Sequence, residues 1–133
     1  MKMAQRELLE SQKKRVELSI VVPAFEEEGN FEKLYLELVK VLTSLDMSWE
    51  IVFADDGSRD KTWQKIKSLH DRDQRVRGVR LSRNFGHQHA LLAGLSKATG
   101  DAVVTMDADL QHAPELILRL AKHARNPTSL LVG

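Results

Sequence analysis

The chain has 133 residues, 42% of them hydrophobic, which is enough for one domain with a hydrophobic core and too little for two. Its 20 basic and 19 acidic residues nearly cancel, so no overall field indicates nucleic acid or a membrane surface as a partner. There is no cysteine, which excludes disulfides and thiolate metal sites.

The chain divides into a short arm and one domain. Residues 1–16 are mostly charged and can bury little surface, so we expect a charged N-terminal arm there and a domain over residues 17–133. The first apolar run, residues 18–22, predicts a strand. We expect this strand to end at Pro23, because proline lacks the N–H that a central strand donates.

Helices and strands alternate along the rest of the domain. Further strands are predicted over residues 49–54, 76–81 and 102–106, with a fifth beginning at Ser129. Helices are predicted from Asn30 as N-cap to about Leu45, from about Asp60 to Asp73, over residues 86–98, and from Pro114 to Asn126. Strands that alternate with single helices through short loops indicate βαβ units, a parallel sheet and right-handed crossovers, so the predicted fold class is α/β. The more basic strand 76–81 is expected near an edge of the sheet.

Polar clusters follow three of the predicted strands, in residues 23–28, 55–56 and 107–111. Ligands of a parallel sheet bind beyond the carboxyl ends of its strands, so we expect these clusters to meet at one edge. Carboxylate and amide oxygens suit Mg²⁺ or Mn²⁺, and such an ion can bridge to phosphate oxygens. The residues therefore predict a metal-dependent site for a phosphorylated ligand.

Each cluster alone also has a plain structural interpretation. Asp107 could cap a helix or a turn, and Asp-x-Asp is common. Residues 55–58 could form a turn in which Gly57 supplies a positive φ. The histidines, His87 among them, are interpreted as solvated polar side chains rather than ligands. A joint site is favoured because the clusters end different strands of one sheet.

Four motifs occur in order: Val22-Pro23-Ala24-Phe25 followed by acidic residues, Asp55-Asp56-Gly57-Ser58-Arg59-Asp60-Lys61-Thr62, Ser82-Arg83-Asn84-Phe85-Gly86, and Asp107-Ala108-Asp109-Leu110-Gln111-His112. Together they resemble family 2 glycosyltransferases over residues 18–118. The closer resemblance is to the polyprenyl-phosphate branch, which includes dolichol-phosphate mannosyltransferases and undecaprenyl-phosphate sugar transferases. It implies a GT-A fold, a three-layer sandwich with a mainly parallel sheet, truncated here after about the fifth strand.

The resemblance implies an inverting enzyme that moves a sugar from a nucleotide diphosphate donor, of the UDP-glucose or GDP-mannose type, to an acceptor such as polyprenyl phosphate. The residues implied to bind the donor are Pro23, Phe25, Glu27, Phe53, Asp55, Asp107, Ala108, Asp109 and Gln111. Asp107, Asp109 and Gln111 are implied to hold Mg²⁺ or Mn²⁺, and the two aspartates are the implied catalytic residues. Arg83 and Asn84 lie in a motif that shapes the donor side of the family's pocket.

Two residues depart from the family's pattern, and the chain is short for it. Glu26 stands where the family usually has asparagine, and Ala113 where close relatives commonly carry proline. No apolar run approaches the ~20 residues that span a bilayer, so we expect the chain as given to be soluble and cytoplasmic. The acceptor-binding and membrane-associated parts are expected outside this chain, in a parent protein at the cytoplasmic face of a membrane.

Two other function classes fit parts of the pattern. One is a non-catalytic or remnant nucleotide-sugar-binding module, favoured by the short length and by Glu26. The other is a phosphoacceptor receiver domain, which also places acidic residues at strand ends, although here the acidic pair follows the second strand. The sequence leaves open the donor nucleotide and sugar, the acceptor and the oligomeric state.

Overall fold

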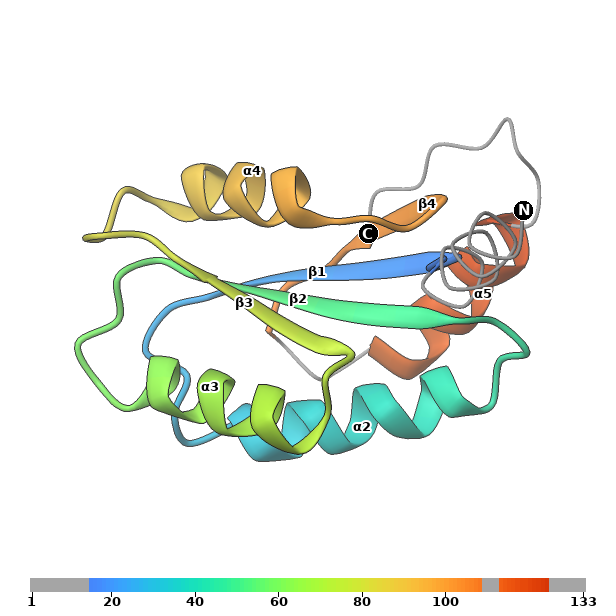
Figure 1. The fold of residues 1–133 in the computed structure, drawn as a ribbon, viewed down its shortest axis with the longest axis horizontal. Helices are drawn as coiled ribbons and strands as arrows, with labels where there is room; N and C mark the ends of the chain where they lie inside the picture. Colours follow the sequence, from blue (N-terminus) through green and yellow to red (C-terminus); the bar gives the residue numbers. More distant parts are fainter. Residues whose placement is uncertain (1–14, 109–112, 125–133) are drawn as a thin grey trace, which may run out of the picture.

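The computed structural model describes residues 15–108 and 113–124. Strands and helices alternate along the chain (Figure 1). They are β1 (Leu18–Ala24), α2 (Phe31–Thr43), β2 (Trp49–Asp55), α3 (Thr62–Arg72), β3 (Val76–Arg80), α4 (His87–Lys97), β4 (Ala102–Thr105) and α5 (Ala113–Ala124). The predicted α/β class is confirmed. Residues 1–14 of the predicted arm and the fifth predicted strand lie outside the described residues.

The strands form one parallel sheet in the order β3-β2-β1-β4. β2 and β3 lie successively on one side of β1, whereas β4 pairs with its other side, so the winding direction reverses between β1 and β4. β3 is at the edge, as predicted. In sheets of this kind the carboxyl ends of the strands beside the reversal form the usual ligand site.

The central strand β1 does not end at Pro23, contrary to the prediction, but continues to Ala24. Backbone groups of a strand point alternately to its two neighbours. The Val21 carbonyl accepts a hydrogen bond from Met106 N (3.0 Å) on the β4 side, and the Ala24 carbonyl accepts one from Asp56 N (2.9 Å) on the β2 side. Pro23 therefore faces the β4 side, where pairing with β4 has already ended at Val21. The missing N–H costs no ladder bond there.

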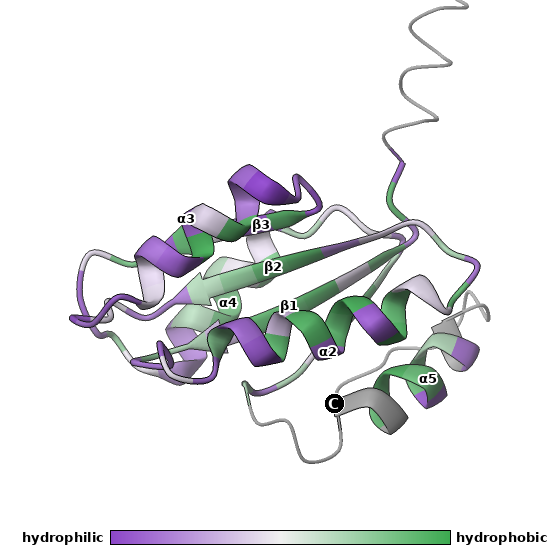
Figure 2. Cartoon of the chain, turned by 90° about the horizontal axis from the view of Figure 1, so that it is seen from below, coloured by the Kyte–Doolittle hydropathy of each residue, from purple (hydrophilic) through white to green (hydrophobic). Residues whose placement is uncertain are grey.

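Helices cover both faces of the sheet and make it a three-layer structure (Figure 1). α2 and α3 lie on one face, where the rings of Phe31 and Phe53 pack with centroids 4.5 Å apart. α4 lies on the other face and approaches β1 so closely that a Cβ on Gly94 would come within 2.5 Å of Val21. β1 and β2 are hydrophobic along most of their length, whereas α2 and α3 carry both hydrophobic and hydrophilic stretches (Figure 2). None of the helices described here is long and apolar enough to cross a membrane.

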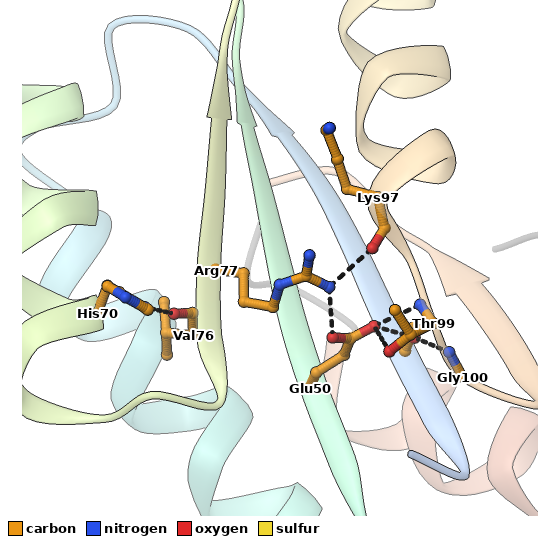
Figure 3. A network of polar contacts seen from close by, with 8 residues as sticks. Glu50, His70, Val76, Arg77, Lys97, Thr99 and Gly100 are labelled. Atoms are coloured by element: carbon orange, nitrogen blue, oxygen red, sulfur yellow. Dashed lines mark hydrogen bonds and ion pairs between the residues drawn. The ribbon is translucent and has the colours of Figure 1, made fainter. Parts of the chain in front are cut away.

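A buried carboxylate, Glu50, joins the strands near their amino ends (Figure 3). Its Oε2 accepts hydrogen bonds from Ser19 Oγ (2.6 Å) and Thr99 N (2.7 Å), and its Oε1 accepts one from Arg77 Nη1 (2.9 Å). Burial raises the pKa of Glu50, but the hydrogen bonds from Ser19, Thr99 and Arg77 together outweigh burial and hold the pKa below its ordinary value. This network ties β1, β2 and β3 to the turn before β4, at the end of the sheet opposite the polar clusters.

Candidate functional site

A cavity of about 850 Å³ opens beyond the carboxyl ends of β1, β2 and β4. It is lined by residues from four separate segments: Pro23, Ala24, Phe25, Glu27, Asn30, Asp56, Asn84, Gly86, His87, Ala90, Asp107 and Ala108. The cavity thus lies beside the reversal of winding between β1 and β4. The predicted meeting of the three polar clusters at one edge of the sheet is confirmed.

Five of the predicted site residues line this cavity: Pro23, Phe25, Glu27, Asp107 and Ala108. The side chain of Asp107 is 74% exposed and therefore accessible to a ligand. Asn84, from the motif before α4, lines the cavity as well, whereas Arg83 is not among its lining residues. Asp109 and Gln111 lie outside the described residues, so two of the three predicted metal ligands have no described position.

Phe53 and Asp55 are fully buried and do not line the cavity. Alternate residues of a strand share one face, so both side chains point to the same side of β2. Phe53 packs on Phe31. Asp55 accepts hydrogen bonds through Oδ1 from the backbone N (3.2 Å) and the hydroxyl of Ser58. A direct contact of Phe53 or Asp55 with the donor stays a prediction.

The second oxygen of Asp55 is an unused acceptor. Oδ2 is buried and has no hydrogen-bond partner among the described residues, although the Arg80 Nε lies 3.4 Å away and balances its charge. A buried carboxylate oxygen in this state costs free energy unless a donor group reaches it. Asp55 therefore keeps one buried acceptor oxygen without a hydrogen-bond partner among the described residues, and Asp55 does not line the cavity.

Four further lining residues, Asn30, Asp56, Gly86 and His87, were not among the predicted donor-binding or metal-binding residues. Asn30 occupies the N-cap position of α2, as predicted, but its side chain makes no capping hydrogen bond. Asp56 belongs to the polar cluster predicted after the second strand, and Gly86 belongs to the third family motif. His87 is exposed, as interpreted from the sequence, but its Nε2 lies 3.5 Å from Asp107 Oδ1.

The described lining is acidic. Glu27, Asp56 and Asp107 line the cavity, and the lining residues within the described ranges include neither lysine nor arginine. Among those same residues, no three histidine, aspartate or glutamate side chains are grouped as a metal site. A diphosphate in this cavity would meet repulsion from carboxylates unless a cation lies between them.

Residues 19–133 match the family model described as Glycosyl transferase family 2. The chain belongs to this family. The resemblance inferred from the four motifs is thereby confirmed.

Two curated relatives show which branch of the family is similar. The chain is 41% identical over 108 residues to the undecaprenyl-phosphate 4-deoxy-4-formamido-L-arabinose transferase of Pseudomonas paraeruginosa, which covers 80% of this chain and 32% of the relative. It is 35% identical over 118 residues to the dolichol-phosphate mannosyltransferase of Pyrococcus furiosus, covering 89% of this chain and 33% of the relative. The chain spans about a third of the length of the curated relatives it matches.

Among solved structures, the chain is similar to a mannosyltransferase from Pyrobaculum calidifontis in complex with GDP-Man and Mn²⁺. The TM-score is 0.62 at 26% identity, and the match covers 86% of this chain and 34% of that one. The predicted GT-A fold is confirmed by this likeness together with the parallel sheet.

Proposed function

We propose that this chain is the donor-binding part of an inverting glycosyltransferase that moves a sugar from a nucleotide diphosphate to polyprenyl phosphate. The cavity beside the reversal of winding carries the proposal, because residues from all four family motifs line it, the strand-end acid Asp107 among them. The names of the two relatives, both polyprenyl-phosphate sugar transferases, support the choice of acceptor.

A divalent cation, Mg²⁺ or Mn²⁺, belongs to this proposal. The donor set fits, because Asp107 lines the acidic cavity and the predicted partners Asp109 and Gln111 add hard oxygen ligands. The solved mannosyltransferase that contains both GDP-Man and Mn²⁺ supports this assignment. When bound, the cation would neutralise the charge that develops on the departing nucleoside diphosphate.

The chain's own residues supply the rest of the donor site. Phe25 lines the cavity and is 39% exposed, so its ring is available for a nucleobase to stack on. A hydrogen bond from the donor to Asp55 would require a ligand group to reach its buried Oδ2, which has no hydrogen-bond partner among the described residues. We assign no catalytic base, because the oxygen of a lipid phosphate is already anionic near neutral pH and attacks without losing a proton.

The test is calorimetric titration of the chain with UDP-glucose and with GDP-mannose, each with and without Mn²⁺. We expect one donor to bind only when Mn²⁺ is present. Replacing both Asp107 and Asp109 by alanine should abolish this binding, whereas Asp101→Ala, an exposed residue paired with Arg15 at the other end of the sheet, should leave it intact. Undiminished metal-dependent binding in the double variant would refute the proposal.

Transfer to polyprenyl phosphate is measured separately, in a protein that includes the remaining length of the relatives. Metal-dependent donor binding without transfer in that longer protein would favour the non-catalytic nucleotide-sugar-binding module. The phosphoacceptor receiver domain is no longer supported, since the chain belongs to a glycosyltransferase family.

A further inference from the structure

Two loops line opposite parts of the cavity wall, and residues 56–62, from the end of β2 to the first residue of α3, hold both loops by hydrogen bonds. The loop between β1 and α2 contributes Phe25 and Glu27 to the lining, and the loop before α4 contributes Asn84 and Gly86. Asp56, Ser58 and Thr62 of this segment accept hydrogen bonds from backbone amides of the two loops.

The first loop is held through its backbone amides. Thr62 Oγ1 accepts a hydrogen bond from Glu27 N (2.9 Å), and Ser58 Oγ accepts one from Glu26 N (2.8 Å). The Thr62 hydroxyl donates its own proton to Asp60 Oδ1, which leaves its oxygen free to accept. Thr62 and Ser58 are almost completely buried, so water cannot readily replace them as partners of these amides.

The second loop is held by Asp56. Its Oδ1 accepts a hydrogen bond from Phe85 N (2.9 Å), and its Oδ2 accepts one from Gly86 N (3.1 Å). Asp56 is only 4% exposed, whereas the Asp107 side chain is 74% exposed. Both oxygens of this buried carboxylate therefore already accept hydrogen bonds from the loop. Hydrogen bonds to an ionised carboxylate are stronger than those between neutral groups.

We infer that Asp56 and Thr62 are positioning residues that fix the two facing walls of the cavity before a ligand enters. Binding to loops that are already ordered avoids the entropy cost of ordering them at that moment. The inference rests on the proposed function only for the identity of the ligand, the nucleotide-sugar donor. The anchoring itself is a property of the chain without ligand.

The first measurement needs no ligand and follows hydrogen exchange at the amides of the two loops. In Thr62→Val, which keeps the side-chain shape but removes the acceptor, exchange at Glu27 should become about 3- to 10-fold faster while Phe85 and Gly86 stay unchanged. Asp56→Asn should produce the opposite pattern. Thr62→Ser restores the hydroxyl and should restore slow exchange. Should Thr62→Val fail to fold, Ser58→Ala tests the same loop at Glu26.

The second measurement is donor titration in the presence of Mn²⁺. Thr62→Val and Asp56→Asn should each weaken donor binding by about 3- to 10-fold, and Thr62→Ser should bind as the wild type does. Thr43→Val, the same chemical change at the end of α2, and Asp101→Asn, at the other end of the sheet, are the matched controls and should bind normally.

Three results test the roles of Asp56 and Thr62. Unchanged exchange in the variants overturns the anchoring, and faster exchange with unchanged donor affinity overturns the positioning role. If the wild type binds neither donor, the proposed function fails, and the exchange pattern alone decides whether Asp56 and Thr62 hold the loops.

Discussion

Gly57 lies directly against the backbone of Arg83: a Cβ on Gly57 would come within 2.3 Å of the Arg83 carbonyl carbon and 2.6 Å of Asn84 N. Gly57 also has a φ of +69°, which residues with a side chain rarely adopt. This contact brings the end of β2 against the loop before α4, within reach of the Asp56 carboxylate.

Gly57→Ala should therefore destabilise the fold by about 2 kcal/mol or more, because it adds both backbone strain and a steric clash with main-chain atoms. Urea unfolding measures the change. Gly86→Ala separates the two effects, since Gly86 has a φ of +110° but open space where the Cβ would lie. Gly29→Ala, with open space and no positive φ, is the control. An equal effect at all three glycines would contradict the clash.

Glu26→Asn should stabilise the fold by about 0.5 kcal/mol. Glu26 has a φ of +51°, a left-handed conformation that asparagine tolerates better than glutamate does. The expected result is a higher urea midpoint with an unchanged slope. Glu28→Asn removes the same charge from the same loop at a residue without positive φ, and a similar gain there would show that charge rather than backbone strain is responsible.

Glu50→Gln should destabilise the fold by about 1–3 kcal/mol at pH 7, because it weakens the charge-assisted bonds to the buried carboxylate. The pKa of Glu50 is lowered in the folded state from 4.5. A carboxylate whose pKa is lowered on folding stabilises the folded state at pH values above its unfolded-state pKa. This stabilisation is lost as the pH falls through the folded-state pKa. The deficit of Glu50→Gln should therefore shrink as the pH falls below about 4.5.

Urea unfolding at several pH values between 7 and 3 checks this expectation. Glu37→Gln, at a partly exposed residue of α2, is the control for loss of a carboxylate. A deficit of Glu50→Gln that is the same at every pH would mean that packing, and not the ionised carboxylate, accounts for the loss.

Phe25→Ala should weaken donor binding by about fivefold or more, because stacking of a base on an aromatic ring contributes about 1–3 kcal/mol. Titration with the donor and Mn²⁺ measures the loss. Leu36→Ala removes an exposed apolar side chain of α2 away from the cavity lining and should bind the donor normally. Unchanged affinity in Phe25→Ala would place the base elsewhere in the cavity.

Local sequence patterns predicted the helices, the first four strands and the acidic edge of the sheet, whereas the fifth predicted strand lies outside the described residues. Apolar periodicity records which side of each element is buried, and the parallel topology follows from the alternation of strands and short helical connections. The position of the cavity followed as well, because every polar cluster directly follows a strand. Pro23 was the exception, since its tolerance within β1 depends on where the neighbouring β4 stops pairing.

Only the tertiary structure decided what each residue at that edge does. Asp55 and Asp56 are adjacent and chemically identical. Asp55 is fully buried and does not line the cavity, whereas Asp56 lines it and accepts hydrogen bonds from the amides of Phe85 and Gly86, about 30 residues away along the chain. Thr62 likewise acts on Glu27, 35 residues before it. Local sequence determines that a polar group stands at a strand end, but its role depends on which distant backbone the folded sheet brings within hydrogen-bonding distance.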